Sequence, residues 1–289
     1  MKNNVNDILA LIPQNQEGEL VLKEALYFQQ ILGMRIVVFN VLKAPSILSR
    51  TFQTGRIESL KDKAKQSLKD FVKNAIQKEI PKNIIFAINE GDIVSNLIRE
   101  SKEGGYDFII VDKSKSSFKS TPQWYKIDKF ISRSHCPVLT INKDFPARKI
   151  KKILIPIDIS QSAKKRLLWA SLFAKKFNAK IQIVSALNIN ISETKSLAFK
   201  NAEKIKYLLW DQGIECDVKI LRIHKQEKHK AILKYINEEK PDLVILRTHQ
   251  DLIFSGTNIG KFVSEIVHGC KMPVFTVNYS RKPPKTLFL

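Results

Sequence analysis

The stretch that decides the fold is Pro241–Asn278, PDLVILRTHQDLIFSGTNIGKFVSEIVHGCKMPVFTVN. It starts with a short apolar run, passes through a polar and then an amphipathic segment, and ends in a second apolar run. Continuous apolar runs of this length are typical of central parallel strands that are covered on both faces. We therefore predict strand, loop, helix and strand. The loop after the first strand is where such an α/β fold holds a phosphate.

The same order occurs earlier in the chain, over Tyr106–Asn142. The apolar run Ile8–Ile12 likewise corresponds to Ile153–Ile157. The offset between the copies shrinks along the chain, which indicates extra residues in the first copy, most simply around Lys43–Arg56. We predict one unit written twice, with a first domain at residues 1–145 and a second at 146–289.

Each copy alternates strands with helices, so we predict an α/β fold of two tandem doubly wound, five-stranded parallel-sheet domains. Glycines mark helix ends, Gly33 after the first helix and Gly213 after the helix predicted over 192–210. A lysine-rich helix is predicted over 57–79, with Pro81 ending it. Trp169 and Trp210 fall on apolar helix faces, and we predict that both belong to the core.

Composition places the chain among globular proteins, with 44% hydrophobic and 27% charged residues. No apolar run is long enough to span a membrane, and the N-terminus lacks secretory features, so we predict a cytoplasmic protein. Cys136, Cys216 and Cys270 form no metal-type cluster and are predicted to be buried thiols. The net charge is +21, of which residues 146–289 carry +15. Such a balance favours anionic partners, although the lysines form no stripe interleaved with aromatics.

At this point the residues resemble a known family. The segment KKILIPIDISQSAKKRLLWASLFAKKFNAKIQIVSAL, Lys151–Leu187, is similar to the opening of a universal stress protein domain. Pro241–Asn278 resembles the closing half, and Tyr106–Asn142 repeats it in the first copy. The resemblance implies a doubly wound sheet in each copy, and pairing of the two copies through their last strands. Some members of the family bind ATP and others do not.

In the binders, an Asp ends the first strand and a G-x-x-G-(nine residues)-G-[ST] pattern cradles phosphate, because glycines let backbone N–H groups approach the anion. In the second copy the Asp matches Asp158, followed by Ser160. The first two glycines are replaced by Arg247 and Gln250. The third is present as Gly260, followed by Lys261 in the Ser/Thr position. The resemblance thus implies a degenerate nucleotide site built from Asp158, Gly260 and Lys261.

The first copy departs further from the pattern. The Asp position falls at Pro13, and the first two glycine positions fall at Asp112 and Lys115. The third falls at Tyr125 or Trp124, depending on the direction of counting. An acidic residue and a bulky aromatic would repel or block a phosphate, so we predict no nucleotide site there.

Other chemistry finds little support. Gly256–Lys261 fails as a phosphate-binding P-loop, because three residues instead of four separate the glycines and Phe262 follows the lysine. His224 and His229 are five residues apart, which does not form a helical metal pair. His249 has no partner with clear spacing, and His135 and His268 are interpreted as packing residues. No catalytic or metal motif is predicted.

The sequence therefore predicts a non-catalytic universal stress protein that acts as a stress-response or regulatory module through partner binding. This hypothesis requires no cofactor. The alternative is a nucleotide-binding switch that uses ATP in the second domain, with slow hydrolysis left open. A third class, binding of nucleic acid or another acidic surface, rests on charge alone. Pairing of the domains within the chain is expected, further homodimer formation is left open, and no membrane contact is predicted.

Overall fold

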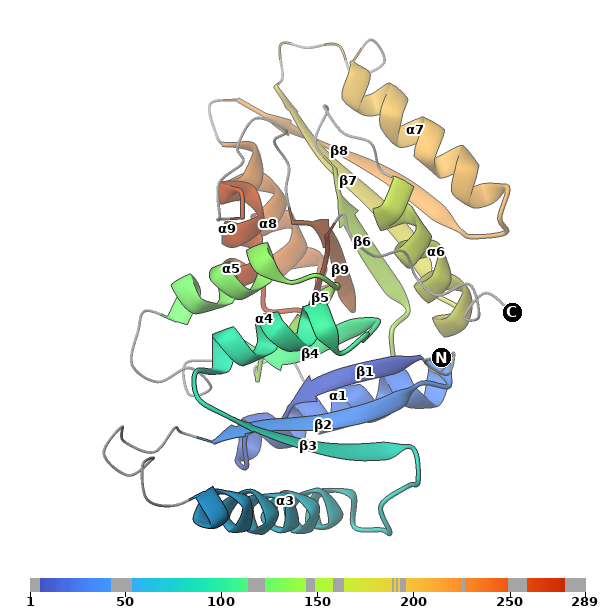
Figure 1. Cartoon of the computed structure of the whole chain (residues 1–289). Helices are drawn as coiled ribbons and strands as arrows, with labels where there is room; N and C mark the ends of the chain where they lie inside the picture. Colours follow the sequence, from blue (N-terminus) through green and yellow to red (C-terminus); the bar gives the residue numbers. More distant parts are fainter. Residues whose placement is uncertain are drawn as a thin grey trace.

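The apolar runs predicted as strands are strands in a computed structural model of the chain (Figure 1). The structure describes residues 6–42, 54–113, 123–143, 149–157, 164–188, 190, 192, 196–224, 227–248 and 259–278. The first half contains β1 (Asp7–Leu11), α1 (Gln16–Leu32), β2 (Arg35–Leu42), α3 (Thr54–Ile76), β3 (Ile84–Glu90), α4 (Ile93–Glu103), β4 (Phe108–Asp112), α5 (Gln123–Arg133) and β5 (Val138–Ile141). The second contains β6 (Lys152–Pro156), α6 (Lys164–Phe177), β7 (Lys180–Asn188), α7 (Leu197–Trp210), β8 (Cys216–Ile223), α8 (Lys228–Glu239), β9 (Leu243–Arg247), α9 (Lys261–Gly269) and β10 (Val274–Val277).

The two halves share one continuous sheet. Its ten strands lie in the order β3-β2-β1-β4-β5-β10-β9-β6-β7-β8, so each half contributes five parallel strands in the same relative order. The halves meet where β5 pairs antiparallel with β10, with Leu139 opposite Phe275. The predicted α/β fold of two doubly wound five-stranded sheets is confirmed, and the pairing through the last strands joins the two sheets into one.

Threonines on both sides of this junction add hydrogen bonds across it. Thr140 Oγ1 donates to the carbonyl of Val274 over 3.3 Å, and Thr276 Oγ1 donates to the carbonyl of Val138 over 3.1 Å. Both threonines are fully buried. A buried hydroxyl needs a hydrogen-bond partner, so these side chains are satisfied only when the two halves are paired.

Helices cover both faces of the sheet and create two apolar layers. One layer receives α1, α3, α6 and α7, and the other receives α4, α5, α8 and α9. Each layer contains buried residues from both halves of the chain. The junction between the halves is therefore an interior packed from both sides rather than a wet contact between two separate domains.

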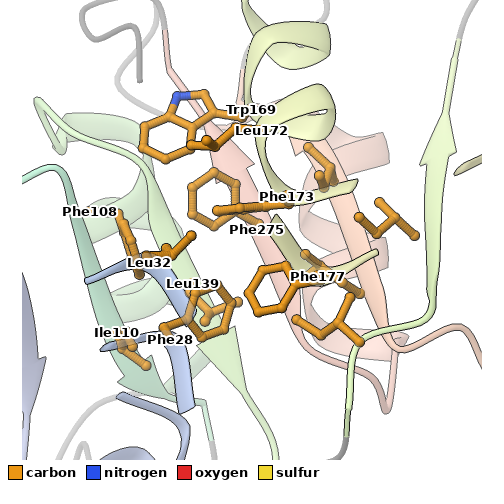
Figure 2. Packing of buried hydrophobic residues seen from close by; sticks show 14 of the residues in the cluster. Phe28, Leu32, Phe108, Ile110, Leu139, Trp169, Leu172, Phe173, Phe177 and Phe275 are labelled. Carbon is orange, nitrogen blue, oxygen red and sulfur yellow. The ribbon is translucent and has the colours of Figure 1, made fainter. Parts of the chain in front are cut away.

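Aromatic rings from both halves fill the centre of the first layer (Figure 2). Phe28 of α1 and Phe108 of β4 come from the first half, and Phe173 of α6 and Phe275 of β10 come from the second. The rings meet edge to face, with 5.6 Å between the centroids of Phe28 and Phe173 and 5.6 Å between those of Phe108 and Phe275. Such pairs contribute about 0.5–1.5 kcal/mol each beyond burial of their area.

Several local predictions are confirmed and others are wrong. Gly33 has φ of 69° and ends α1, and Gly213 has φ of 73° after α7. The prediction that Pro81 ends the lysine-rich helix is wrong, because α3 ends at Ile76 and the left-handed Gln77 (φ 54°) follows. The helix predicted over 192–210 begins only at Leu197, because the side chain of Ser196 caps it by accepting from Phe199 N.

The prediction for the two tryptophans is half right. Trp169 of α6 is fully buried beside Phe275, at 5.1 Å between ring centroids. Trp210 was predicted to lie in the core and is instead 47% exposed at the end of α7. Its indole Nε1 donates to the carbonyl of Cys216 over 3.2 Å, which holds the ring at the sheet edge. Among the described residues, no helix is long and apolar enough to cross a membrane.

Candidate functional site

The predicted nucleotide site lies at the carboxyl ends of the parallel strands of the second half. There β9 ends at Arg247 and α9 begins at Lys261. Asp158, Ser160 and Gln250 lie outside the described residues, as does the segment from His249 to Asn258. The structure therefore places Gly260 and Lys261 of the predicted set.

Gly260 is the residue that precedes α9. Its carbonyl accepts from the N–H groups of Val263 and Ser264, at 2.9 and 3.1 Å, and it has φ of −59° and ψ of 150°. A Cβ built on Gly260 would meet no atom of the described residues within 4 Å, and its backbone conformation is one that other residues adopt. Within this part of the chain, neither packing nor conformation requires a glycine before α9.

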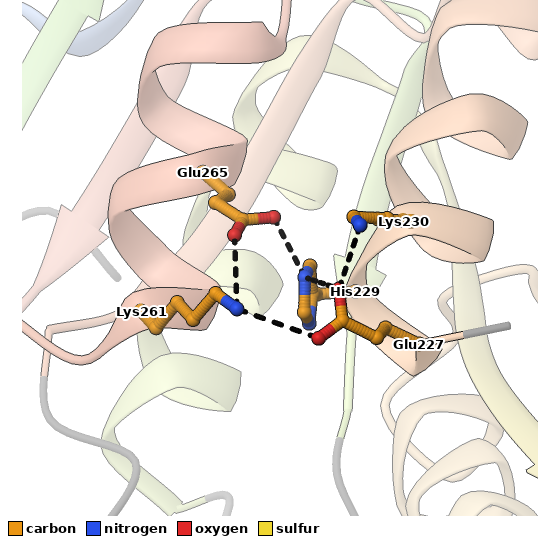
Figure 3. Close-up of polar contacts among 5 residues, drawn as sticks. All are labelled: Glu227, His229, Lys230, Lys261 and Glu265. Atoms are coloured by element: carbon orange, nitrogen blue, oxygen red, sulfur yellow. Dashed lines mark hydrogen bonds and ion pairs between the residues drawn. The ribbon is translucent and has the colours of Figure 1, made fainter.

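Lys261 belongs to a cluster of charged side chains, which we call the α8–α9 charge cluster and which consists of Glu227, His229, Lys230, Lys261 and Glu265 (Figure 3). Lys261 Nζ lies 3.4 Å from Glu227 Oε1 and 3.8 Å from Glu265 Oε1. Glu227 precedes α8 and Glu265 lies one turn into α9. The ammonium therefore faces two carboxylates from two helices.

His229 is the third basic side chain of this cluster, beside Lys230 and Lys261. Its Nε2 lies 2.7 Å from Glu265 Oε2 and 3.2 Å from Glu227 Oε2. Hydrogen bonds from Lys230 and Lys261 lower the pKa of Glu227 to about 2, so this carboxylate is ionised at neutral pH. The sequence did not predict this cluster. The i, i+4 spacing of Lys261 and Glu265 could have indicated their ion pair within α9, but not the contacts with α8.

Arg247 occupies the position of the first lost glycine. It ends β9 opposite Val277 of β10, and partial burial lowers its pKa, although a guanidinium remains charged throughout the physiological range. Its neighbour Thr248 donates from its backbone N–H to the carbonyl of Val277 over 3.1 Å. Arg247 thus places a positive charge near the strand end.

The matching place in the first half is filled differently. Asp112 ends β4 with 1% exposure, and Lys113 follows it with 8% exposure. Lys113 Nζ donates to the carbonyls of Val267 and Cys270, both at 2.6 Å, at the C-terminal end of α9. Burial lowers the pKa of Lys113 to about 8. The lysine therefore caps a helix of the other half, where a cation also complements the helix dipole.

A second polar contact between the halves joins α5 to α9. Asp128 accepts a hydrogen bond from Ser264 Oγ over 2.6 Å and pairs with His268 Nε2 over 2.8 Å. Asn278 Nδ2 also donates to the carbonyl of Ser134 near the end of α5. Sequence reasoning interpreted His268 as a packing residue. His268 follows Ser264 by four residues, so both side chains lie on one face of α9, and this spacing could have indicated a shared contact.

The remaining candidates add no chemistry. Cys136, Cys216 and Cys270 are buried free thiols, as predicted. Burial raises the pKa of Cys216 to about 12, which makes its thiol inert at neutral pH. Within the described part of the chain, no group of three or more His, Cys, Asp or Glu side chains is arranged to hold a metal ion. The side chains of Trp124 and Tyr125 lie outside what the structure describes.

The strand order defines a doubly wound, Rossmann-like α/β protein built as a tandem pair. Residues 149–278 match the model of the universal stress protein family. The chain thus carries a universal stress protein domain in its second half, and the resemblance noted for Lys151–Leu187 and Pro241–Asn278 is confirmed. No curated protein sequence matches the chain.

Solved structures extend the likeness in fold to almost the whole chain. A universal stress protein from Archaeoglobus fulgidus DSM 4304 aligns with a TM-score of 0.68 and 19% identity, over 95% of this chain and 99% of that one. A protein described as functionally unknown, from Pseudomonas aeruginosa PAO1, aligns with a TM-score of 0.58 and 17% identity, over 96% and 94% of the two chains. At this identity the likeness shows the fold alone.

Proposed function

We propose that the protein is a non-catalytic, tandem universal stress protein that works as a stress-response or regulatory module by binding a protein partner. The observation that carries this proposal is the outer face of α7. Leu197, Tyr207, Leu208 and Trp210 are large hydrophobic side chains that are 64%, 57%, 47% and 47% exposed. We call these four residues the α7 apolar face. Tyr207 and Trp210 lie edge to face with 5.7 Å between their ring centroids, and adjacent exposed apolar side chains of this kind mark a surface for interaction.

The charge around this face indicates the chemistry of the partner. Lys200 and Lys204 are exposed on the same helix, and Lys206 Nζ lies 4.5 Å from the centre of the Trp210 ring. Residues 146–289 carry +15 of the net charge. A protein surface with acidic side chains around an apolar centre complements both features. We therefore propose an acidic protein partner.

The α8–α9 charge cluster supports a role without phosphate chemistry. Phosphate at the N-terminus of α9 would meet the carboxylates of Glu227 and Glu265 beside Lys261. Like charges this close oppose binding of an anion. Arg247 and Gln250 stand where ATP-binding members of the family have glycines. This replacement also opposes phosphate binding, because side chains limit close approach of the backbone to phosphate.

A second candidate function, an ATP-dependent switch in the second domain, is favoured by Gly260 at the N-terminus of α9, where no described residue fills the place of a side chain. It would use Asp158, Gly260 and Lys261, with Arg247 as an added cation. A thermal-shift titration with Mg-ATP separates the two candidates, because a ligand that binds the folded state raises the melting temperature. We expect no shift up to millimolar Mg-ATP. A shift in the wild type that disappears in Lys261→Ala would establish the switch instead.

The partner proposal is tested by photo-crosslinking in cells under stress. A photoreactive phenylalanine analogue replaces Leu208 of the α7 apolar face, and in a matched control it replaces Leu60 of α3, because these leucines are 47% and 49% exposed. We expect an acidic protein to crosslink at position 208 and not at position 60. Equal crosslinking at both positions would contradict a specific face.

The crosslinked protein is then purified and its affinity measured directly. Tyr207→Ser together with Trp210→Ser is expected to weaken binding by about 30-fold or more, as loss of central aromatic anchors does in other interfaces. A double variant that binds like the wild type would remove the α7 apolar face from the proposal.

We also propose the domain boundary predicted from the sequence, with one domain at 1–145 and another at 146–289, because β5 ends at Ile141 and β6 begins at Lys152. The three buried free thiols fit a reducing compartment such as the cytoplasm. A protein tagged with a fluorescent reporter would test that location.

A further inference from the structure

A cavity lies at the junction of the two halves, at the opposite end of the sheet from the carboxyl ends of β4 and β9. It has a volume of about 580 Å³ and is lined by α1, by the segment that leads into β6, and by the end of α6. These elements meet at the amino ends of their strands, because Lys151 precedes β6 and Phe177 precedes β7. Pockets that hold small ligands occur often between domains and have volumes of about 300–1,000 Å³.

One wall of the cavity is aromatic and held rigidly. Tyr27 of α1 and Phe177 of α6 stack with 5.4 Å between ring centroids and 25° between planes. Phe28 braces Phe177 edge to face at 5.2 Å. The hydroxyl oxygen of Tyr27 accepts a hydrogen bond of 2.9 Å from the backbone N–H of Ile150. The two halves thus fix an aromatic wall that neither half would form alone.

The rest of the cavity lining is positively charged, because it contains three lysines. Lys149, Lys151 and Lys176 all line the cavity, and all three are exposed. Lys151 Nζ lies 3.5 Å from the carbonyl oxygen of Phe177 and 3.4 Å from that of Asn178, at the end of α6. These are long contacts that leave the ammonium able to turn toward a ligand. Three cations around one opening concentrate anions there.

Nearby carboxylates do not cancel this charge. None of the lining residues that the structure describes is acidic. Beyond the effect of burial, Asp242 lies close enough to raise the pKa of Tyr27, and backbone N–H groups of Lys151 and Lys152 donate to its Oδ2, at 2.9 and 2.8 Å; it sets one negative charge, outside the lining, against three lysines. Glu24 is buried in α1, and burial raises its pKa to about 7, so part of it is neutral at physiological pH.

We propose that this cavity binds a small organic anion that has a planar ring and a phosphate or similar group. The ring would contact Tyr27, which Phe177 supports from behind with only 5% of its own surface exposed, and the anionic group would lie among the three lysines. Aromatic faces favour planar partners, and ammonium groups act as point charges for phosphate. Both halves contribute groups to the cavity, so a ligand here would also report on the pairing of the halves.

The test uses 1-naphthyl phosphate as the probe and inorganic phosphate as its comparison, titrated into the full chain by isothermal titration calorimetry at low salt. We expect 1-naphthyl phosphate to bind about tenfold or more tightly than phosphate, because only the former covers apolar surface. Lys149→Glu with Lys176→Glu should weaken the binding of 1-naphthyl phosphate at least about tenfold.

A matched variant carries the same change of charge elsewhere. Lys200→Glu with Lys204→Glu alters two exposed lysines of α7, a helix with no residue among those that line the cavity. This control should keep the wild-type affinity within about twofold. The proposal is overturned if no binding occurs at millimolar probe, if both double variants lose affinity equally, or if neither does.

A third variant tests the aromatic wall by a ratio, which does not depend on the fraction of folded protein. Tyr27→Leu should reduce the preference for 1-naphthyl phosphate over inorganic phosphate while binding of phosphate is kept. An unchanged preference would show that the ring of the ligand does not contact Tyr27.

Discussion

The ends of β4 and β9 occupy matching positions in the two halves, and a lysine lies at each end of α9, Lys113 near its C-terminal end and Lys261 at its first residue, but the two lysines make different contacts. Lys113 is buried, and its ammonium donates to two carbonyls at the C-terminal end of α9. Lys261 begins the same helix and its side chain is 69% exposed among carboxylates. One lysine joins the halves and the other lies on the surface.

This difference shows how two copies of one fold can come to have different roles at the same position. In the first half, the space at the carboxyl end of the sheet is used to attach the other half. In the second half, no described residue fills the place of the missing side chain at Gly260, and the start of α9 carries acidic neighbours. A duplicated chain needs only one copy of a surface site, so the other copy is free to change into an interior contact.

Truncation of the two lysines should separate these roles most strongly. Lys113→Ala leaves two buried carbonyls without their donor and removes a packed aliphatic stem, and we expect a loss of about 3 kcal/mol in the free energy of unfolding. Lys261→Ala should change that free energy by no more than about 0.5 kcal/mol, because exposed ion pairs contribute little. Urea denaturation of both variants measures the contrast. Equal losses would show that Lys113 is not a structural tie.

The pH dependence should sharpen the same contrast. Burial lowers the pKa of Lys113 from 10.5 to about 8. Between these values the unfolded chain holds a proton that the folded chain has released, so stability rises with pH across this range. Relative to Lys113→Ala, the wild type should gain up to roughly 3 kcal/mol between pH 8 and 10.5, at about 1.4 kcal/mol per pKa unit.

Cys270 must be controlled in this measurement, because it lies beside Lys113. Burial raises the pKa of its thiol from 9.0, so its contribution falls as the pH rises through its folded pKa. The two groups therefore act in opposite directions. Unfolding measured from pH 7 to 10 in a Cys270→Ala background isolates the lysine. A difference between the lysine and alanine forms that stays constant with pH would contradict the assignment.

Loss of the contact between α5 and α9 should lower the free energy of unfolding less than loss of Lys113 does. Asp128→Asn weakens the interactions with Ser264 and His268, and we expect a loss of about 1–2 kcal/mol, because the aspartate side chain is only 13% exposed. Asp70→Asn is the matched control, since Asp70 accepts an exposed hydrogen bond from Gln66 within α3. The control should lose less than about 0.5 kcal/mol. Chemical denaturation distinguishes the two, and similar losses would mean that the α5–α9 contact adds no stability.

Much of the fold could be predicted from local chemistry. Apolar runs such as Ile8–Ile12 and Ile153–Ile157 can be satisfied only inside a sheet covered on both faces, and Gly33 and Gly213 mark conformations that other residues avoid. The repeat then fixed the order of elements. Gly260 was singled out differently, by the resemblance to the universal stress protein family, in which the third glycine of the phosphate pattern opens a helix; here Gly260 directly precedes α9.

The rest depends on contacts between distant residues. Lys113 looks like a surface lysine until α9, more than 150 residues later, supplies carbonyls within 2.6 Å. Trp210 looked like a core residue because α7 has apolar side chains on more than one face. Only the packing of Ala202 and Leu209 inward determines which of those faces is covered. The cavity beside Tyr27 exists only where two helices of different halves meet.

The smallest effect is expected at the α8–α9 charge cluster, and it tests whether this cluster is a surface feature. Glu227→Gln removes a carboxylate that pairs with Lys230, Lys261 and His229. We expect the melting temperature to change by no more than about 1 °C, because solvent and salt screen exposed ion pairs and forming them costs side-chain entropy. The effect should shrink further at 0.5 M salt, where the screening length is about 4 Å. Differential scanning fluorimetry at low and high salt measures both values. A large decrease that persists at high salt would mean that the charges position α8 and α9 as Lys113 positions the two halves, and the distinction between the two lysines would fail.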